Sequence, residues 1–276
     1  MSLRHYQYSM SKELFITHPT DYEYRGAMAQ FWDLLRGDTS NWPDKFFYQA
    51  IIAESGQPVL DVGCGTGRLL LDYMSQGIDT DGVDNSPEML AICRPKAQQL
   101  GIQPNLYQQA METLDLPRRY RTIIVPSSSF QLVTEPNDAT EAMQRFFQHL
   151  EPGGALAMAF LAYYMGDEKG PVVTGEWQKE VIRPEDGATV RRWSRSRIDL
   201  FNQLEHTEDR YDVIVNGEVV ASEALARSPA TRIYTQAQVV KLYETAGFTN
   251  IRVYSEFSLK PATATDKGFT VLGTRP

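Results

Sequence analysis

The stretch VLDVGCGTGR, residues 59–68, decides the fold of this chain. Its first half is a short apolar run typical of a buried strand. Its second half places Gly63, Gly65 and Gly67 directly before a helical pattern. Glycine adopts positive φ angles without strain and lets a ligand lie against bare backbone, and a helix N-terminus adds free N–H groups. The stretch therefore predicts a strand, a ligand-binding turn and a helix in direct succession.

The spacing of the glycines distinguishes two classes of nucleotide site. A dinucleotide-binding turn reads G-x-G-x-x-G, which would need glycine at the position of Arg68. The next predicted strand ends at Asp84, about 20 residues after the first glycine, where an acidic side chain can accept hydrogen bonds from both ribose hydroxyls. A turn or helix-capping role is the alternative for a lone aspartate at a strand end. The combination favours a ribose-binding Asp84 and disfavours a nicotinamide-dependent dehydrogenase.

Strands and helices alternate on both sides of this stretch. We expect strands at residues 58–62, 79–83, 105–108, 122–126 and 155–161, and helices at 68–76, 86–100 and 137–150. Such alternation with short loops predicts a parallel sheet with right-handed crossovers. Two more helices are expected ahead of it, at residues 22–35 and 44–55.

The pattern changes after residue 165. Apolar runs at 191–201, 204–215 and 218–225 lack helical spacing, and Asn216-Gly217 between two of them is a strong hairpin signal. A capping box at Thr235 and Gln238 then opens a helix that ends at Gly247. The last strands, 250–257 and 268–273, are expected to form an antiparallel hairpin. We therefore divide the chain into a helical cap (1–42), an α/β domain (43–170 and 235–276) and an antiparallel β insertion (171–234) that covers the site as a lid.

Composition excludes several classes of protein. The net charge of −8 argues against a protein that binds nucleic acid mainly through phosphates. The longest apolar run, residues 155–165, falls short of the roughly 20 residues that a membrane span needs. Cys64 and Cys93 form neither a disulfide framework nor a zinc cluster. We expect a cytoplasmic protein without metal, membrane or nucleic-acid partner, present as a monomer or homodimer.

Three motifs resemble a known family. DVGCGTG (61–67) and GVDNSPEML (82–90) are similar to motifs of the class I S-adenosylmethionine (SAM)-dependent methyltransferases, and LEPGGALAMAF (150–160) is similar to the third motif of that family. The resemblance implies an α/β fold with a doubly wound, mostly parallel seven-stranded sheet whose last strand is antiparallel. It also implies SAM as cofactor. Gly63 and Gly65 would hold its methionine part, Asp84 its ribose, and Asp61 would support the loop or reach the amino group through water.

One position departs from the family. An acidic residue usually follows the third strand and bonds the adenine amino group, but this chain has Ala110 there. The adenine contact then falls to Gln109 or Glu112, with the backbone N–H of Met111 on a ring nitrogen. The full set of expected cofactor-binding residues is Asp61, Gly63, Cys64, Gly65, Gly67, Asp84, Asn85, Met111, Glu112, Pro126 and Ser127.

Candidates for the substrate pocket come from segments that reach the carboxyl edge of the sheet. Aromatic side chains suit a sulfonium as cation–π partners and as groups that exclude water. Ordinary core packing is the alternative for the N-terminal aromatic residues. The candidates are Tyr24, Trp32, Ser129, Gln131, Tyr163 and Tyr164.

The insertion carries a basic stretch, residues 191–197, with four arginines. It could clamp an anionic substrate, but pairing with Glu205, Glu208 and Asp209 on the neighbouring strand is favoured. His149 is interpreted as a helix C-terminal histidine, not as a base.

The sequence thus predicts an enzyme that transfers a methyl group from SAM to an N or O atom of a small molecule. In-line displacement depends mainly on proximity and orientation, and no dedicated catalytic residue is identified. The insertion resembles small-molecule N-methyltransferases that act on amino sugars or glycine. The alternatives are a non-catalytic SAM-binding protein and a methyltransferase of a protein or tRNA.

Overall fold

The computed structural model describes residues 23–161 and 172–276. Its main sheet has seven strands in the order β10-β11-β5-β4-β1-β2-β3. All neighbours pair in parallel except β11, which is antiparallel to both β5 and β10. The predicted topology is therefore confirmed. The strands are β1 (Val59–Val62), β2 (Thr80–Asp84), β3 (Leu106–Gln108), β4 (Tyr120–Val125), β5 (Leu150–Leu161), β10 (Thr249–Ser255) and β11 (Gly268–Thr274).

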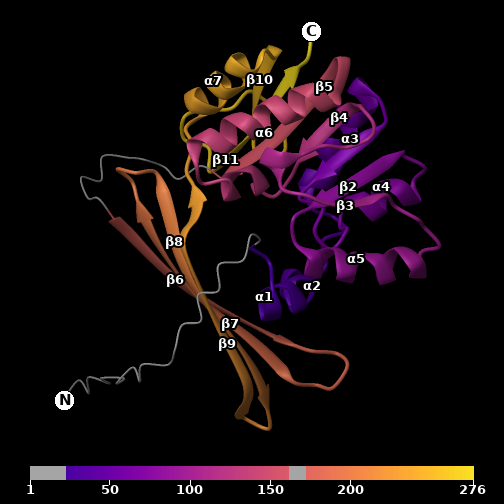
Figure 1. The fold of residues 1–276 in the computed structure, drawn as a ribbon. Coiled ribbons are helices and arrows are strands. Elements are labelled where there is room, and N and C mark those ends of the chain that lie inside the picture. The colour runs from indigo at the N-terminus through magenta and orange to yellow at the C-terminus, as the bar shows by residue number, and fades with distance from the viewer. Residues whose placement is uncertain (1–22, 162–171) are drawn as a thin grey trace.

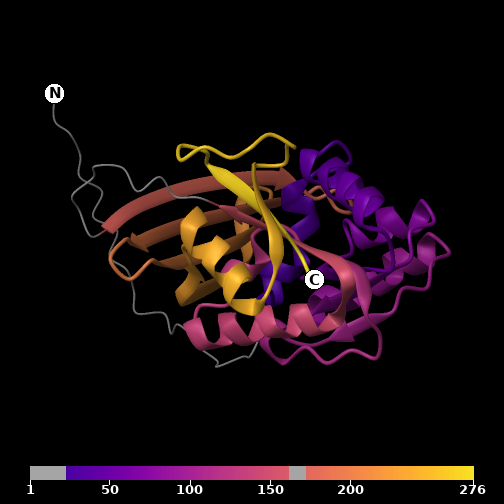
Figure 2. The ribbon, with the colours of Figure 1, turned by 90° about the horizontal axis from the view of Figure 1, so that it is seen from above.

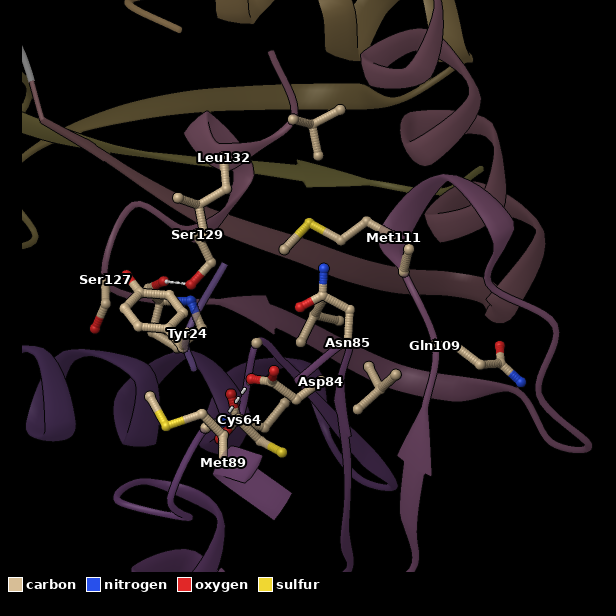
Figure 3. A pocket seen from close by; sticks show the side chains of 18 of the residues that line it. Tyr24, Cys64, Asp84, Asn85, Met89, Gln109, Met111, Ser127, Ser129 and Leu132 are labelled. Carbon is tan, nitrogen blue, oxygen red and sulfur yellow. Dashed lines mark hydrogen bonds between the residues drawn. The ribbon is translucent and has the colours of Figure 1, made fainter. Parts of the chain in front are cut away.

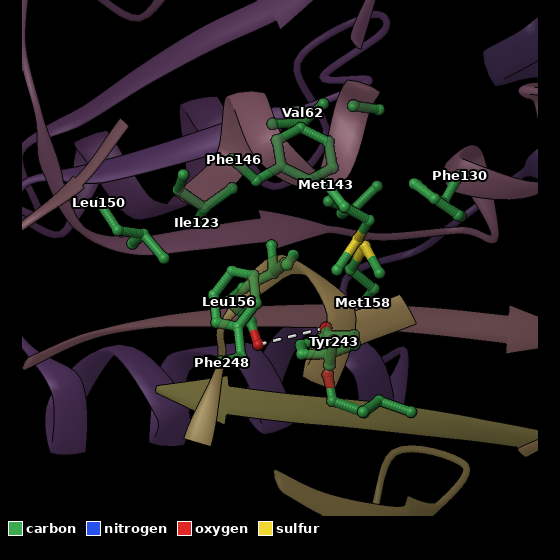
Figure 4. Close-up of a cluster of buried hydrophobic side chains, with 14 of the residues drawn as sticks. Val62, Ile123, Phe130, Met143, Phe146, Leu150, Leu156, Met158, Tyr243 and Phe248 are labelled. Carbon is green, nitrogen blue, oxygen red and sulfur yellow. Dashed lines mark hydrogen bonds between the residues drawn. The ribbon is translucent and has the colours of Figure 1, made fainter. Parts of the chain in front are cut away.

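Helices cover both faces of this sheet (Figures 1 and 2). On one face α6 and α7 pack on the strands through Phe146 and Tyr243, which belong to one buried cluster with Ile123 and Leu156 (Figure 4). On the other face the core is closed by α3 and α4. Because both faces are buried, the strands read as continuous apolar runs. The helices are α3 (Pro43–Ser55), α4 (Leu70–Ser75), α5 (Pro87–Gln99), α6 (Pro136–His149) and α7 (Gln236–Ala246).

Two helix starts follow the local signals in the sequence. Ser86 caps α5 by accepting a hydrogen bond from the Met89 backbone N–H, 3.1 Å away. Thr235 and Gln238 form the predicted reciprocal capping box at the start of α7. Such caps satisfy N–H groups that have no partner inside the helix.

The insertion is a separate antiparallel sheet in the order β6-β7-β8-β9, one strand more than the three that the apolar runs indicated. Asn216 and Gly217 both have positive φ angles, 52° and 83°, as a tight two-residue hairpin requires. The apolar face of this sheet packs on the N-terminal helices, with Val190 and Tyr211 against Met28 and Phe31. The strands are β6 (Val172–Ile182), β7 (Thr189–Asp199), β8 (Leu204–Val215) and β9 (Glu218–Arg232).

The single N-terminal helix predicted at 22–35 is wrong. The structure has two short helices, α1 (Gly26–Gln30) and α2 (Trp32–Arg36), joined at Phe31, whose φ of −99° and ψ of 8° leave the helical region. The first turn of α1 is fixed by partners far along the chain. Glu88 accepts a hydrogen bond from the Gly26 N–H, and Glu223 accepts one from the Ala27 N–H. Tertiary contacts therefore set these boundaries.

The two short helices lie between the second sheet and α5 (Figure 1). No helix within the described ranges is long and apolar enough to cross a membrane.

Candidate functional site

A cavity opens at the carboxyl ends of β1, β2, β3 and β4, where the glycine turn and the loops after the other strands meet (Figure 3). The α1–α2 segment forms its outer wall through Tyr24, Trp32 and Arg36. This is the edge at which open α/β sheets bind ligands. The predicted site residues that line the cavity are Tyr24, Trp32, Asp61, Gly63, Cys64, Gly65, Asp84, Asn85, Met111, Glu112, Pro126, Ser127 and Ser129.

Asp84 ends β2 in the middle of this cavity (Figure 3). Its Oδ2 accepts a hydrogen bond from the Gly65 N–H and its Oδ1 one from the Ser86 N–H, both at 2.8 Å. Burial raises the pKa of Asp84 above its ordinary value, and these two hydrogen bonds act in the opposite direction. Each carboxylate oxygen has a second lone pair, so Asp84 can also accept hydrogen bonds from a vicinal diol.

Gly63 lies in close contact with the turn after β4. Its φ is +73°, and a Cβ at this position would lie 2.8 Å from Ser129 Oγ and 2.9 Å from Ser129 Cβ. Any side chain here would clash with the turn after β4 and reduce access to the backbone. The glycine at position 63 therefore keeps the floor of the cavity open.

Asp61 is a buried acid with an unsatisfied oxygen. It lies in β1 with 1 % of its surface exposed, and its Oδ1 has no hydrogen-bond partner. The pKa of Asp61 is raised to about 7, mainly by desolvation, with the charge of Arg68 acting to lower it and that of Asp84 to raise it. A buried polar atom without a partner is costly. An oxygen of this kind beside a cavity is suited to bind a ligand's ammonium group, directly or through water.

The segment after β3 carries the two side chains that the sequence left open for a base contact, Gln109 and Glu112, and both line the cavity. Gln109 is occupied, because its Nε2 donates to the Asp115 carbonyl at 3.1 Å and its Oε1 accepts from the Asp115 N–H at 2.8 Å. Figure 3 shows the Gln109 side chain at the edge of the group, away from Asp84. Of the two residues left open by the sequence, Glu112 keeps its carboxylate available at the cavity wall.

The turn after β4 is strained at two consecutive residues. Ser127 and Ser128 have φ angles of 54° and 61°, which non-glycine residues rarely adopt. The Ser129 hydroxyl donates to the Pro126 carbonyl at 2.7 Å and closes the turn beside Gly63. Strain of this kind is common where a backbone is shaped around a ligand.

The expectation that Gln131 faces the substrate is wrong. Its Nε2 donates to the Arg232 carbonyl at 3.0 Å, and its Oε1 accepts from the Leu161 N–H at 2.7 Å. With 2 % of its surface exposed, Gln131 joins the end of β5 to the end of β9 and does not line the cavity. A buried amide with all its bonds made to backbone has a structural role.

Other predicted residues also lie elsewhere. A Cβ on Gly67 would come 2.6 Å from Cys93 Sγ, so this glycine allows close packing of the turn on α5 and does not line the cavity. Tyr163 and Tyr164 lie outside the described residues.

His149 is structural, since its Nε2 accepts from the Leu116 N–H at 2.9 Å and its Nδ1 lies 2.7 Å from the Arg145 carbonyl.

Three of the four arginines in the basic stretch of the insertion form ion pairs. Arg192 bonds Asp209 at 2.7 Å, Arg191 bonds Glu180 at 2.5 Å, and Arg195 bonds Glu176 at 2.8 Å. These arginines do not line the cavity. The cross-strand pairing interpretation is confirmed for Asp209 and Glu208, whereas Glu205 accepts a hydrogen bond from Thr231 and acids of β6 are additional partners.

Sequence reasoning missed several charged residues at the cavity. Glu135 and Asp138 line it from the start of α6. Arg36 and Arg68 line it on the side of β1 and β4. No sequence signal assigned a site role to the two acids or to Arg36, and Arg68, which ends the glycine stretch, served there only to distinguish two classes of nucleotide site. Their position in the cavity depends on how α1, α2 and α6 dock.

Comparison with known proteins supports one family. Residues 59–154 match the family described as methyltransferase domain. A putative methyltransferase of Geobacillus sp. (strain WCH70) is 23 % identical over 236 residues, which cover 84 % of this chain and 92 % of that protein. The phosphatidylethanolamine N-methyltransferase of Cereibacter sphaeroides is 30 % identical over 147 residues, covering 52 % of this chain and 68 % of that protein.

A third relative is the dTDP-3-amino-3,4,6-trideoxy-alpha-D-glucopyranose N,N-dimethyltransferase of Streptomyces venezuelae. It is 29 % identical over 138 residues, covering 50 % of this chain and 54 % of that protein.

Solved structures share the fold over nearly the whole chain. An S-adenosylmethionine-dependent methyltransferase from Clostridium acetobutylicum superposes with a TM-score of 0.71 at 20 % identity, covering 89 % of this chain and 96 % of that one. The sugar N-methyltransferase KedS8 from Streptoalloteichus gives a TM-score of 0.68 at 19 % identity, covering 95 % of this chain and 99 % of that one. Sequence motifs, strand order and relatives agree, and the chain belongs to the class I, SAM-dependent methyltransferases.

Proposed function

We propose that this enzyme binds SAM in the cavity described above and methylates an amino nitrogen of a small molecule. Two features of the cavity fit such a cofactor. The unpartnered Oδ1 of Asp61 suits the ammonium group of its methionine part. Gly63 exposes bare backbone to the cavity, and the Cβ of any other residue there would press against Ser129 in the cavity wall. Asp84 would hold the ribose, and the segment from Met111 to Glu112 would contact the adenine.

The acidic side chains around the cavity support the proposal that the methyl acceptor is an amine. Glu112, Glu135 and Asp138 line the cavity, and none of them has an ion-pair partner in the described part of the chain. Asp61 and Asp84 add two buried acids. An acidic, partly enclosed site attracts a protonated amine and disfavours an anionic acceptor. Two of the relatives, an amino-sugar N,N-dimethyltransferase and a phosphatidylethanolamine N-methyltransferase, are by name enzymes that methylate nitrogen, which supports an amine as acceptor.

SAM would supply an electrophilic methyl group on a sulfonium. The residues of this chain would align the acceptor nitrogen with the methyl carbon and the sulfur, exclude water and remove a proton. An amine arrives largely protonated at neutral pH, and the carboxylates of Glu135 and Asp138, which line the cavity and have no role in the proposed cofactor contacts, would accept its proton. Burial raises the pKa of Tyr24 to about 12, so its hydroxyl stays protonated and is no base. Tyr24 and Trp32, in edge-to-face contact at 4.8 Å, can shield the reacting atoms from water.

We also propose that the insertion supports the wall of the site. Its sheet packs on α1 and α2 through Val190, Tyr211 and Val213. Lys179 donates to the carbonyl of Leu35 near the end of α2, and Glu223 accepts from the Ala27 N–H at the start of α1. In this proposal the insertion acts as a lid indirectly, because it holds in place the helices that line the cavity. The small-molecule acceptor, the cytoplasmic location and the absence of a nucleic-acid partner remain predictions.

A two-stage experiment tests the function. Thermal unfolding is first measured with SAM, S-adenosylhomocysteine and NAD, since a ligand that binds only the folded state raises the midpoint. We expect a shift with the first two and none with NAD. Release of S-adenosylhomocysteine is then followed with a panel of primary amines and their matched hydroxyl analogues. Turnover of amines supports the proposal. Turnover of the hydroxyl compounds alone would contradict it, and SAM binding without any turnover would favour the non-catalytic alternative.

A further inference from the structure

A second cavity, of about 390 Å³, is lined by α6, α7 and the end of β9. The two helices lie side by side over one face of the seven-stranded sheet (Figures 1 and 2). Positions three and four apart share one face of a helix, and the lining residues have this spacing on both helices. From α6 they are Pro136, Ala139, Thr140, Met143 and Gln144. Two helix faces therefore enclose a space that the chain itself does not fill.

The inner lining of this second cavity is apolar. Ala139, Met143 and Ala246 belong to the buried core of the seven-stranded sheet, and Leu242 packs against that core. Lys241, in contrast, is exposed and adds a positive charge to the lining. A mostly apolar space with a few polar groups and this volume is typical of sites for small molecules.

Tyr234 provides a hydrogen-bond donor in this lining. Its side chain is 8 % exposed, and its hydroxyl is buried without a hydrogen-bond partner in the described part of the chain. Burial raises the pKa of Tyr234 to about 12, while the charge of Arg232 acts to lower it. The hydroxyl therefore keeps its proton and can donate. A buried hydroxyl without an acceptor is costly, so an acceptor atom of a ligand would stabilise it.

Arg232 places a cation in the same lining. Its Nε donates to the Thr134 carbonyl at 2.5 Å, and it has no carboxylate partner among the described residues. Its two terminal nitrogens are therefore available to an anion. A guanidinium binds a carboxylate through two parallel hydrogen bonds. Arg232 and the Tyr234 hydroxyl together suit an anionic head group beside an apolar body.

The second cavity shares structural elements with the cavity at the carboxyl edge of the sheet. Glu135 and Asp138 line the first cavity from the start of α6, and Ala139 lines the second from the same turn. Thr134, whose carbonyl bonds Arg232, also lines the first cavity. A ligand that fixes the start of α6 therefore acts on the walls of both cavities.

We propose that the second cavity binds a small apolar molecule with one anionic head group, and that this molecule changes the affinity of the first cavity for the methyl acceptor. The head group lies at Arg232 and the Tyr234 hydroxyl, and the apolar body lies between α6 and α7. The binding is independent of the proposed function, whereas the effect on the acceptor rests on it.

Calorimetry with octanoate and 1-octanol tests the site, because the two share an alkyl chain and differ in the charged head group. The pair 2-naphthoate and 2-naphthol repeats the comparison with a rigid aromatic body. We expect at least one carboxylate to bind, on the order of 10-fold more tightly than its uncharged partner. Tighter binding of octanoate would assign a flexible body to the ligand, and tighter binding of 2-naphthoate a rigid one. No binding of either carboxylate, or equal affinities within both pairs, would overturn the inference.

Tyr234→Phe removes the hydroxyl alone and should weaken the carboxylate at least about fivefold. Tyr48→Phe is the matched control, since the Tyr48 hydroxyl is also buried without a partner but does not line this cavity. Both variants lose an unsatisfied polar group, so a change in stability is common to both, and only Tyr234→Phe should lose affinity. Equal affinities of the two variants would show that the hydroxyl has no role in binding and overturn the site. Arg232→Gln, which keeps a donor for Thr134, should lose the preference for the carboxylate over the alcohol.

The effect on the acceptor is measured as the dissociation constant of an amine substrate in the presence of S-adenosylhomocysteine. Saturating carboxylate should change it at least about fivefold, and saturating amine should change the carboxylate affinity by the same factor. An unchanged amine affinity would overturn the effect on the acceptor. If neither SAM binding nor amine turnover is found, the proposed function fails, and calorimetry with the carboxylates still decides the second site.

Discussion

β1 of the seven-stranded sheet is buried along its whole length, whereas residues 175–180 of β6 in the four-stranded sheet are all exposed. Charged residues in the two sheets also differ in their burial and in their partners. Asp61 in β1 keeps an unpartnered oxygen in the interior. Arg191 and Arg195 in β7 pair with Glu180 and Glu176 on β6, within reach of solvent.

This difference indicates where ligand binding is concentrated. A buried charge without a partner costs several kcal/mol, so it is expected only where a ligand uses it. Exposed pairs contribute little and hold strand register. Substitutions at the carboxyl edge of the seven-stranded sheet should therefore change the affinity for SAM strongly. Substitutions in the insertion should change it little.

The largest effect is expected for Asp84→Ala. The change removes the acceptor of the Gly65 and Ser86 N–H groups and, in the proposed function, of the ribose hydroxyls. Several lost charge-assisted bonds predict a dissociation constant for SAM raised by at least about 100-fold. The SAM-induced thermal shift should disappear. Asp79→Ala, an exposed acid paired with Arg118, should keep the full shift. A full shift in Asp84→Ala would remove Asp84 from the ribose role.

The second prediction concerns the pH dependence of stability at Asp61. Burial raises its pKa from 3.8 to about 7. Between these values the unfolded chain has lost the proton and the folded chain still holds it. Stability therefore falls as pH rises through this window, by about 4 kcal/mol for this group. Asp61→Asn removes the penalty, so urea unfolding at pH 8 should show the variant gaining stability over wild type, with little difference at pH 4.

Two controls accompany this measurement. Asp79→Asn should keep the wild-type slope above pH 5, because Arg118 lowers the pKa of Asp79 and moves its titration below that range. SAM binding to Asp61→Asn should be weaker at pH 8 despite the higher stability. Identical pH profiles for wild type and Asp61→Asn would show that Asp61 is not a strained acid.

The third prediction separates backbone strain from steric exclusion at the glycine turn. Gly63 and Gly77 both have positive φ, +73° and +81°, but a Cβ would meet Ser129 at the first and nothing within 4 Å at the second. Gly77→Ala should cost about 1–2 kcal/mol of stability and leave SAM affinity unchanged. Gly63→Ala should cost more and also weaken SAM, measured by urea unfolding and calorimetry. Equal behaviour of the two variants would contradict the role given to the Gly63 backbone.

Local signals predicted the seven-stranded half well. Its strands are apolar runs between glycine and proline signals, and the caps at Ser86 and Thr235 depend on residues three positions away. The placement of Asp84 also follows from a local motif. The cavity residues in these motifs could therefore be identified without a structure.

The other half depends on long-range contacts. The start of α1 is set by Glu88 and Glu223, and the role of Gln131 by the backbone of Leu161 and Arg232. No local pattern marks such partners. For the same reason Arg36 could not be placed in the cavity from the sequence, since its position depends on how α2 docks.

The smallest effect is expected in the insertion. Arg195 is 47 % exposed and bonds Glu176 at 2.8 Å, so Arg195→Ala should change stability by no more than about 0.5 kcal/mol. Because Arg195 does not line the cavity, the KM for an active amine should stay the same. Arg192→Ala is the comparison, since its partner Asp209 is fully buried and would lose its main cation, which predicts a clearly lower thermal midpoint. A tenfold rise in the acceptor KM for Arg195→Ala alone, without loss of stability, would restore the anion-clamp hypothesis for the basic stretch. It would also show that the four-stranded sheet contacts the acceptor directly.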